Sequence, residues 1–415
     1  MTHHTLNRRQ LFRSSTLGLA AVTGWQANII AQASTLRSNA TACILLWMGG
    51  GPSQLDTWDP KPNSGNAGDA GAIQTAIPGV QISDRLPKTA KAMSQISLLR
   101  GMHGPEGSHP RASYWAQTGY LPSASIKHPT IGSHVSHHIG NPESDLPAFV
   151  RIGANRNLIG AGFLGVDHEP FAITDPNQPP LNTTITTTKN RFSRRLGLLD
   201  QLEEDSTREG AEQWTRANRK VYGKAARMIT SPLMKAFDLQ QETVASRESY
   251  GEGNFASGCL MARRLVESGV TFVQVTSNNW DTHFDNYERT STLCQEVDRP
   301  YARLLADLQE RGLLDSTLVI WMGEFGRTPR INGRGGRDHY PRAYSIALAG
   351  CGVSAGQVIG ETDVNGENIL SGKTSVPDLL TTIYDKLGID AFHENLSSVG
   401  RPIRVVENGS LIEGV

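Results

Sequence analysis

The sequence predicts an α/β fold in which a mostly parallel central sheet has helices on both faces. Three continuous apolar runs, each followed by a polar turn, are typical of strands buried on both faces; they are residues 40–51, 269–283 and 316–329. Segments with apolar residues at helical spacing, 255–269 and 294–312, precede the second and third runs. Helix followed by strand, twice over, favours parallel strands whose connecting helices cover the sheet.

Shorter segments extend this pattern. The first apolar run ends in three glycines, which indicates a turn that faces a ligand. Residues 344–350 are predicted to form another short buried strand. Residues 375–389 are predicted to form a helix that packs on the sheet, with Ser375 as its N-cap and Gly388 as its C-cap.

The segment 122–235 differs in composition from the rest of the chain. Pro- and Asn-rich pieces such as 175–188 lead into a long charged helical stretch. We interpret 122–235 as an insertion that forms a cap or lid on a single domain spanning 40–415. The alternative is a surface helical hairpin without a functional role.

The N-terminus has the features of a twin-arginine export signal. Arg8 and Arg9 precede an apolar stretch, and residues 31–33 offer a cleavage site of the small-x-small type. We expect residues 1–33 to be a signal peptide and the protein to be periplasmic or extracellular, with membrane contact only during export. The alternative is an ordinary amphipathic N-terminal helix. No later segment has the ~18 consecutive apolar residues of a membrane span.

Charge and cysteine content narrow the function classes. Lys and Arg number 40, as do Asp and Glu, so the formal net charge is zero. This balance argues against nucleic acid or a membrane surface as the partner. The four cysteines lie far apart without zinc-binding spacing and are predicted to be buried thiols, with a disulfide as the open alternative. They are Cys43, Cys259, Cys294 and Cys351.

Acids and histidines follow the three apolar runs, where strands are expected to end. Ligands of open α/β sheets bind beyond the carboxyl ends of the strands. Carboxylates and imidazoles gathered there need a compensating cation, and zinc takes such oxygen and nitrogen ligands. Taken singly, each of these residues is also an ordinary turn or capping residue. They are Ser53, Asp56 and Asp59 after the first run, Asp281, His283 and Asp285 after the second, and Glu324 and Arg327 after the third.

A glycine- and arginine-rich segment, 333–345, follows the third run. Its glycines would let backbone approach a ligand closely, and Arg334 and Arg337 suit an oxyanion. The adjacent Asp338 and His339 form a frequent metal or acid–base pair. We predict an anion site beside a metal here; the alternative is a solvated basic loop.

The turn before a predicted aromatic helix carries Ser108, His109, Arg111 and Ser113. A helix N-terminus with a hydroxyl or imidazole beside it is a natural oxyanion site, and ordinary capping is the alternative. The remaining histidines are interpreted as surface or structural residues, among them His134, His137, His138 and His168.

Several long motifs resemble the DUF1501 family of exported bacterial proteins, which is assigned to the alkaline phosphatase/sulfatase superfamily. In order, the motifs are MGGGPSQLDTWDPKP, GSHPRASYWAQTGY, ARRLVESGVTFVQV, WDTH, GLLDSTLVIWMGEFGRTP and GRDHYP. The resemblance covers nearly the whole chain after the signal. It implies a three-layer alkaline phosphatase-like sandwich.

The resemblance also implies roles for single residues. Asp281 and His283 match the ligands of a first metal, and His339 matches the late histidine that completes it. Glu324 falls on an acid that binds metal, whereas Phe325 replaces the second ligand of that motif.

Two further positions concern the nucleophile and a second metal. His109 stands where the nucleophile would be, and neither Cys-x-Pro-x-Arg nor Ser-x-Pro-x-Arg is present. Formylglycine formation is therefore not expected. Asp56 resembles the early acid of the second metal, and Asp338 and Glu324 are expected near that ion.

Together these observations predict an exported metal-dependent hydrolase of phosphate or sulfate esters that uses a divalent ion, zinc or calcium. Its substrate is expected to be an anionic small molecule or glycan. Because the nucleophile and Phe325 depart from the pattern, the alternative is a non-catalytic protein that binds an anionic glycan or phosphorylated ligand. The candidate residues are Ser108, His109, Ser113 and Arg111 for catalysis, Arg327, Arg334 and Arg337 for the substrate anion, and Asp56, Asp281, His283, Glu324, Asp338 and His339 for metal.

Overall fold

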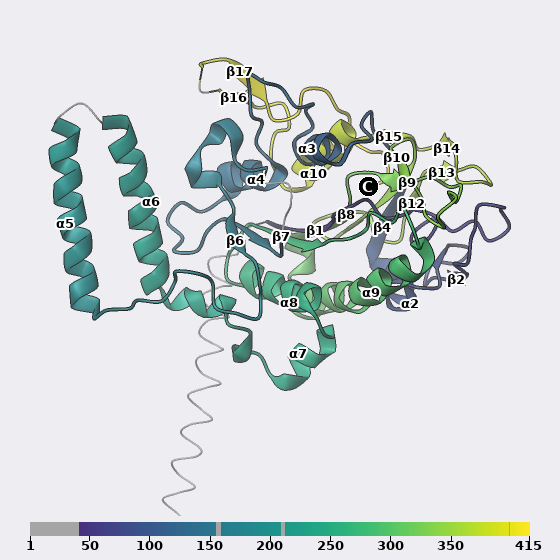
Figure 1. The fold of residues 1–415 in the computed structure, drawn as a ribbon, viewed down its shortest axis with the longest axis horizontal. Coiled ribbons are helices and arrows are strands. Elements are labelled where there is room, and N and C mark those ends of the chain that lie inside the picture. Colours follow the sequence, from purple (N-terminus) through teal and green to yellow (C-terminus); the bar gives the residue numbers. More distant parts are fainter. Residues whose placement is uncertain (1–40, 155–158, 209–211, 398) are drawn as a thin grey trace, which may run out of the picture.

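A computed structural model describes the chain from residue 41 onward (Figure 1). The described ranges are 41–154, 159–208, 212–397 and 399–415. The expected signal peptide and its cleavage site, residues 1–33, lie outside the described residues. None of the described helices is long and apolar enough to cross a membrane.

Within the described residues, nine strands form one central sheet, in the order β12-β4-β11-β8-β1-β7-β5-β6 with β15 beside β4. Strand β11 is antiparallel to both of its neighbours, and the other pairs are parallel. This confirms the mostly parallel α/β sheet. The strands are β1 (Ala42–Met48), β4 (Ile96–His103), β5 (Phe149–Ile152), β6 (Phe171–Ile173), β7 (Phe272–Ser277), β8 (Thr317–Met322), β11 (Tyr344–Ala349), β12 (Val358–Ile359) and β15 (Thr374–Ser375).

Strand β1 shows why the predicted strands are continuously apolar. Successive side chains of a strand point to opposite faces of the sheet. Ile44 and Leu46 therefore pack in one hydrophobic core, and Leu45 and Trp47 pack in the core on the other face. Because β1 lies between β7 and β8, both of its faces are buried and no polar residue alternates along it.

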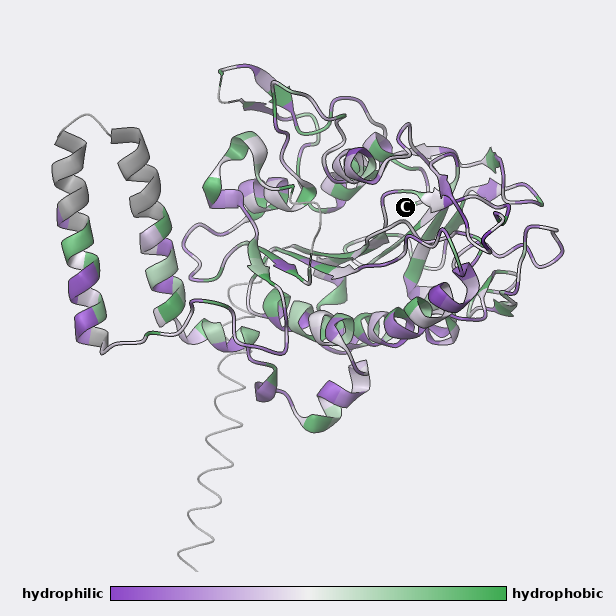
Figure 2. Cartoon of the chain, viewed as in Figure 1, coloured by the Kyte–Doolittle hydropathy of each residue, from purple (hydrophilic) through white to green (hydrophobic). Residues whose placement is uncertain are grey.

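Helices cover both faces of this sheet, and the structure confirms the layered arrangement (Figure 1). In Figure 2 the strands and the adjoining parts of α8 carry apolar residues, shown in green. One face packs against α2 (Pro87–Ala92), α7 (Val244–Tyr250), α8 (Asn254–Glu267) and α9 (Asn286–Glu310), and the other against α3 (His109–Thr118), α4 (Ile131–Ile139) and α10 (Val376–Lys386).

Helix α10 follows the predicted end signals. Ser375 is its N-cap and forms a capping box with Asp378. At the other end the last helical turn closes at Leu387, and Gly388 follows with φ +71°. Glycine tolerates this left-handed conformation, so Gly388 stops the helix one residue after its cap.

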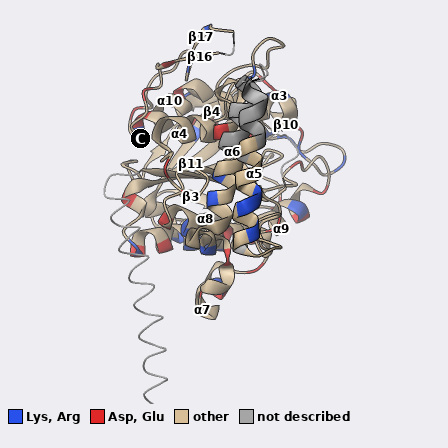
Figure 3. Ribbon diagram, turned by 90° about the vertical axis from the view of Figure 1, so that its left-hand side faces the viewer, with Lys and Arg blue, Asp and Glu red and all other residues tan. Residues whose placement is uncertain are grey.

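The interpretation of 122–235 as one inserted lid is wrong. Helix α4 and strands β5 and β6 fall in this segment, and the two strands extend the central sheet beyond β7. Only a helical hairpin, α5 (Lys189–Arg208) and α6 (Glu212–Thr230), projects from the domain. Figure 1 places this hairpin at one end of the molecule, well away from β9 and β10, so it does not cover the strand ends of the predicted site. Figure 3 shows basic residues on α5.

The remaining strands form small two-stranded sheets outside the central one. They are β2 (Ala72–Gln74) with β3 (Gln81–Ser83), β9 (Gly326–Arg327) with β10 (His339–Tyr340), β13 (Glu361–Thr362) with β14 (Ile369–Ser371), and β16 (Glu394–Leu396) with β17 (Pro402–Arg404). All four cysteines are buried and free, as predicted for core thiols.

A buried ion-pair network joins the helices on one face. The guanidinium of Arg263 on α8 is 1% exposed and lies 2.8 Å from Glu242, 2.8 Å from Glu267 and 3.2 Å from Asp307. The hydroxyl of Tyr250 donates to Asp307 at 2.8 Å. Burial alone would raise the pKa of Glu242, but hydrogen bonding and charge, mainly from Arg263, lower it to about 2.

We predict that Glu242→Gln lowers the free energy of unfolding at neutral pH by about 1–2 kcal/mol, because Arg263 stays buried with one acidic partner fewer. An unfolded glutamate titrates near ~4.3. The contribution of Glu242 is therefore full above that pH and is lost as pH falls toward its folded pKa of about 2.

Urea unfolding of both proteins from neutral to acidic pH measures this contribution. The difference between them should shrink across the window below pH ~4.3, whereas Glu143→Gln, at an exposed position, should behave like wild type throughout. A difference that stays constant across the window would contradict the assignment.

Candidate metal centre

The carboxyl ends of three neighbouring strands meet at one edge of the sheet. Trp47 of β1 lies level with Met322 of β8, and Met48 lies level with Ser277 of β7. The turns that follow these strands therefore leave the sheet side by side. The β9–β10 pair and the N-terminus of α3 supply the other residues of the site.

Three histidines converge on one carboxylate oxygen. The Nε2 atoms of His109, His283 and His339 lie 3.3, 3.1 and 3.4 Å from Oδ1 of Asp281. The Nε2 atoms of His283 and His339 are also 2.9 Å apart. Side chains from α3, the β7–α9 turn and β10 thus gather their nitrogens around a single point.

The opposite nitrogen of each imidazole is held by an oxygen atom. Nδ1 of His109 contacts Glu324 at 2.7 Å, and Nδ1 of His283 contacts Asp338 at 2.7 Å. Nδ1 of His339 lies 2.6 Å from the carbonyl oxygen of Gly107. A carbonyl or carboxylate only accepts, so each neutral ring carries its proton on Nδ1 and presents the Nε2 lone pair to the cluster. Metal-binding histidines characteristically have this outer support.

The free nitrogens fit a bound cation. Nε2 of His109 is buried without a hydrogen-bond partner in the described part of the chain. With the protons on Nδ1, Nε2 of His283 and of His339 both present lone pairs across 2.9 Å, and two acceptors cannot hydrogen-bond to each other. A cation between these lone pairs and Asp281 would satisfy all of them.

Charge around the cluster keeps Asp281 ionised. Burial would raise its pKa, but the charge and hydrogen bond of Arg327 at 2.6 Å, with His109 and His283, lower it to about 2. Burial lowers the pKa of His339, so its ring is neutral at neutral pH. For His109, burial is outweighed by the hydrogen bond and charge of Glu324 and the charge of Asp281, which raise the pKa.

The ligand set differs from the predicted one. In the described residues, the group whose ligand atoms all lie within 4.8 Å of one another is His109, Asp281 and His339. His283, predicted as a ligand, contacts Asp281 and His339 but is not in this group. His109, which the sequence placed as the nucleophile, is in it. One carboxylate and two imidazoles leave an open position on a tetrahedral ion.

Two acids predicted to bind a second metal, Asp56 and Glu324, have partners within the protein. Glu324 is 5% exposed, and its two oxygens accept from the N–H of Gly50 at 3.0 and 3.2 Å while also binding His109. Asp56 is buried against Arg337 at 2.7 Å and accepts from Asn286 at 2.9 Å. A second metal held by these acids stays a prediction.

Two of the three arginines predicted to bind the substrate anion, Arg327 and Arg337, are buried and bind other parts of the protein. Arg327 is fully buried and donates to the carbonyls of Gly50 and Gly51 as well as to Asp281. Arg337 is fully buried against Asp56. The prediction that these guanidinium groups receive a substrate anion is corrected because their donors point into the protein.

Arg334 is exposed, and the glycines of this loop have a different role from the predicted approach to a ligand. A side chain at Gly336 would clash with the backbone of His283. Asn286 donates its backbone N–H to Gly335 at 3.0 Å. The glycines therefore let the loop pack on the residues around His283, and the carbonyl of Arg334 accepts from the N–H of Asp285.

The α3 turn holds the other catalytic candidates. Ser108 is exposed at the N-cap position, and its side chain makes no capping hydrogen bond. Ser113 is buried within the helix at 2% exposure. Arg111 is exposed and donates to Glu106 at 2.6 Å. Of the two serines, only Ser108 has the exposed hydroxyl that a nucleophile requires.

Some of the histidines interpreted as surface or structural residues contact one another. Nδ1 of His137 lies 3.1 Å from Nε2 of His168, whose other nitrogen is 3.1 Å from the hydroxyl of Ser136. His134 is buried. Sequence reasoning also missed the backbone groups of Gly50 and Gly107, since no side chain marks them.

The fold and this cluster define an α/β protein with histidine and carboxylate side chains gathered at the carboxyl ends of its parallel strands. The chain belongs to the DUF1501 family, because the model described as "Protein of unknown function (DUF1501)" matches residues 40–415. The resemblance expected from the motifs is confirmed. No curated protein matches the chain in sequence.

Solved structures similar to the chain include three at low sequence identity. The PsFucS1 sulfatase from Pseudoalteromonas sp. is 15% identical over 88% of this chain and 72% of that chain, with a TM-score of 0.39. The lipoteichoic acid synthase LtaP from Listeria monocytogenes is 8% identical over 88% and 74%, with a TM-score of 0.40. A protein in the alkaline phosphatase superfamily from Vibrio parahaemolyticus is 12% identical over 85% and 67%, with a TM-score of 0.38. None of these likenesses assigns a reaction to this chain.

We predict that Glu324→Gln weakens zinc affinity about 10–100-fold, because the neutral amide holds the His109 ring less firmly than the carboxylate does. His339→Ala, which removes a ligand, should lose nearly all bound metal. Competition with a chromophoric chelator on purified protein measures both affinities. Glu106→Gln, which removes an acid paired with Arg111 nearby, is the matched control and should bind like wild type. Equal affinities of Glu324→Gln and wild type would remove Glu324 from the centre.

Proposed function

We propose that the protein is an exported hydrolase of phosphate or sulfate esters that depends on one divalent metal. The convergence of three imidazole nitrogens on Asp281, each ring fixed from behind by an oxygen, carries the proposal. The Arg8–Arg9 signal supports export. The substrate class is a small anionic ester or an anionic glycan.

His109, Asp281 and His339 would hold the metal. Nitrogen ligands favour zinc over calcium, which binds through oxygen. When bound, such an ion supplies Lewis-acid polarisation of an ester oxygen. The chain itself fixes the ligands: Glu324 orients His109, and the carbonyl of Gly107 orients His339.

His283 and Asp338 are suited to proton transfer. Asp338 fixes Nδ1 of His283 at 2.7 Å, so Nε2 faces the cluster and can take a proton from an attacking group or return it to a leaving group. Exposed Arg334 lies on the adjacent loop and can receive the ester anion. The site thus provides an anion contact, a proton carrier and a set of metal ligands.

The non-catalytic alternative is favoured by one observation. Asp56, the acid expected to bind a second metal, is instead paired with buried Arg337. A site with a single cation could bind an anionic ligand without hydrolysing it. Binding of an aryl phosphate or aryl sulfate without turnover by the metal-loaded protein would favour this alternative.

We predict that Ser108→Ala lowers kcat on 4-nitrophenyl phosphate or sulfate by at least about 100-fold, because Ser108 offers the exposed hydroxyl next to His109. Ser113→Ala should stay within about threefold of wild type, since buried Ser113 cannot reach a substrate. Metal content is measured in parallel, so a lost ligand site is not mistaken for a lost nucleophile. If Ser108→Ala keeps full turnover and metal, Ser108 is not the nucleophile; if loaded wild type hydrolyses neither ester, the hydrolase proposal fails for these substrates.

A further inference from the structure

Positive charge is concentrated on the helical hairpin of α5 and α6. Residues 176–199 lead into α5 and form its first half, and residues 213–237 form α6 and lead back to the domain. These two segments contain four and six Lys or Arg residues and no Asp or Glu. The acids of the hairpin are confined to 200–212, around its tip. Because the formal net charge of the whole chain is zero, this excess of positive charge is local.

Three arginines lie on one exposed face of α5. Arg191, Arg194 and Arg195 are spaced by three and four residues, which places them on the same side of a helix. All three side chains are exposed. The positions three and four residues before and after each of them hold no acid. Within the described part of the chain, none of the three has an ion-pair partner, so their charges are available to an external anion.

The same arginines line a cleft of about 330 Å³. Thr188, Asn190 and Leu198 complete its walls. The hydroxyl of Thr188 and the amide of Asn190 are further hydrogen-bonding groups. Guanidinium groups bind planar and tetrahedral oxyanions through two parallel N–H donors. The cleft therefore combines three such donors with neutral polar groups and contains no acid.

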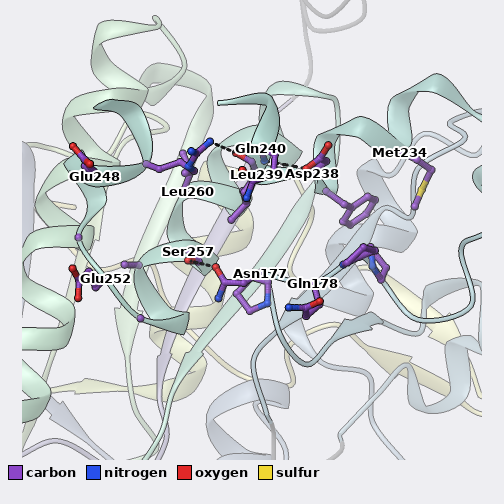
Figure 4. Close-up of a pocket in the computed structure, with 18 of the residues that line it drawn as sticks. Asn177, Gln178, Met234, Asp238, Leu239, Gln240, Glu248, Glu252, Ser257 and Leu260 are labelled. Carbon is purple, nitrogen blue, oxygen red and sulfur yellow. Dashed lines mark hydrogen bonds between the residues drawn. The ribbon is translucent and has the colours of Figure 1, made fainter. Parts of the chain in front are cut away.

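A larger cavity on the domain lacks this excess of one charge. It has a volume of about 830 Å³ and is shown in Figure 4. Glu248 and Glu252 line it together with Arg247 and Arg299. Charges of both signs meet in that cavity, whereas the cleft on α5 is lined by bases alone. Of the two, the α5 cleft is the one that selects a ligand by its charge.

We propose that the face of α5 formed by Arg191, Arg194 and Arg195 binds an anionic polysaccharide that carries sulfate or phosphate esters. Positive charge on the face matches negative charge repeated along the polymer. The choice of a glycan rests on the proposed function, in which an anionic glycan is a substrate class. A polymer held on the hairpin keeps its other esters at a raised local concentration around the metal centre.

The shape and composition of the face favour a polymer over a membrane surface. Leu198, which is 54% exposed, is the one apolar side chain among the residues that line the cleft. A helix that lies in a membrane interface needs a broad apolar face instead. The hairpin projects from the end of the molecule away from β9 and β10 (Figure 1). A small ester cannot contact both places at once, but an extended polymer can.

Isothermal titration with dextran sulfate tests the proposal. Dextran sulfate should bind, and neutral dextran of the same length should not. The triple variant Arg191→Gln/Arg194→Gln/Arg195→Gln should weaken binding at least about tenfold. The matched control is Lys88→Gln/Lys91→Gln/Arg401→Gln, which removes three exposed positive charges outside the hairpin and should stay within about threefold of wild type.

Activity measurements keep this proposal separate from the proposed function. The triple variant on α5 should retain its metal and its turnover of 4-nitrophenyl phosphate or sulfate, because it shares no residue with the metal cluster. If wild type binds dextran sulfate through α5 but hydrolyses neither aryl ester, the hydrolase proposal fails and the glycan-binding face stands.

Three results would overturn the glycan-binding face. They are no binding of dextran sulfate, equal losses in the α5 variant and the matched control, and tighter binding of an oligothymidylate or of phosphatidylglycerol vesicles than of dextran sulfate. The last result would reassign the face to a nucleic acid or a membrane.

Discussion

The negative charge of Asp281 is the constraint on which the site depends. Its Oδ1 faces the guanidinium of Arg327 at 2.6 Å and the Nε2 atoms of three histidines. A fully buried guanidinium is costly unless its charge and donors are matched. For Arg327, Asp281 balances the charge, and Asp281 and the carbonyls of Gly50 and Gly51 accept its hydrogen bonds. The same contacts join the turn after β1, the turn after β7 and strand β9. The interactions that hold this edge of the sheet together therefore also position the candidate metal centre.

Rigidity of the centre comes from the backbone as much as from side chains. The carbonyl of Gly107 fixes His339, and the N–H of Gly50 fixes Glu324, which in turn fixes His109. Gly50 adopts φ +114°, where a side chain would be strained and would meet the backbone at Trp280. The orientations of the His109 and His339 rings thus depend on backbone groups of two glycines, which have no side chain that could mark them as part of the site.

Sequence patterns predicted the parts of the fold that repeat and the parts of the site that sit at strand ends. Strands β1, β7, β8 and β11 were predictable because both of their faces are buried, which leaves uninterrupted apolar runs. Strands β5 and β6 have only four and three residues and were hidden by Pro- and Asn-rich surroundings. Asp281 and His283 were expected at the site from their position after a strand, and His339 from its pairing with Asp338 in the glycine- and arginine-rich segment. Arg327 and Arg337 were misjudged because arginine is seldom fully buried, and the partners that bury them lie more than 40 residues away along the chain.

The aromatic ring of Phe325 packs against two imidazoles of the candidate metal centre. Its ring centroid lies 4.9 Å from that of His109 and 4.7 Å from that of His339, and in the sequence motif it stands where the resemblance implies a further ligand. Asp56, the other acid expected there, is neutralised by Arg337 in a fully buried pair. Phe325 offers no ligand atom, and the carboxylate of Asp56 is already paired with Arg337. In the proposed hydrolysis with one cation, charge on the leaving group would have to be met by groups of the protein, and His283 and exposed Arg334 are the candidates for that role.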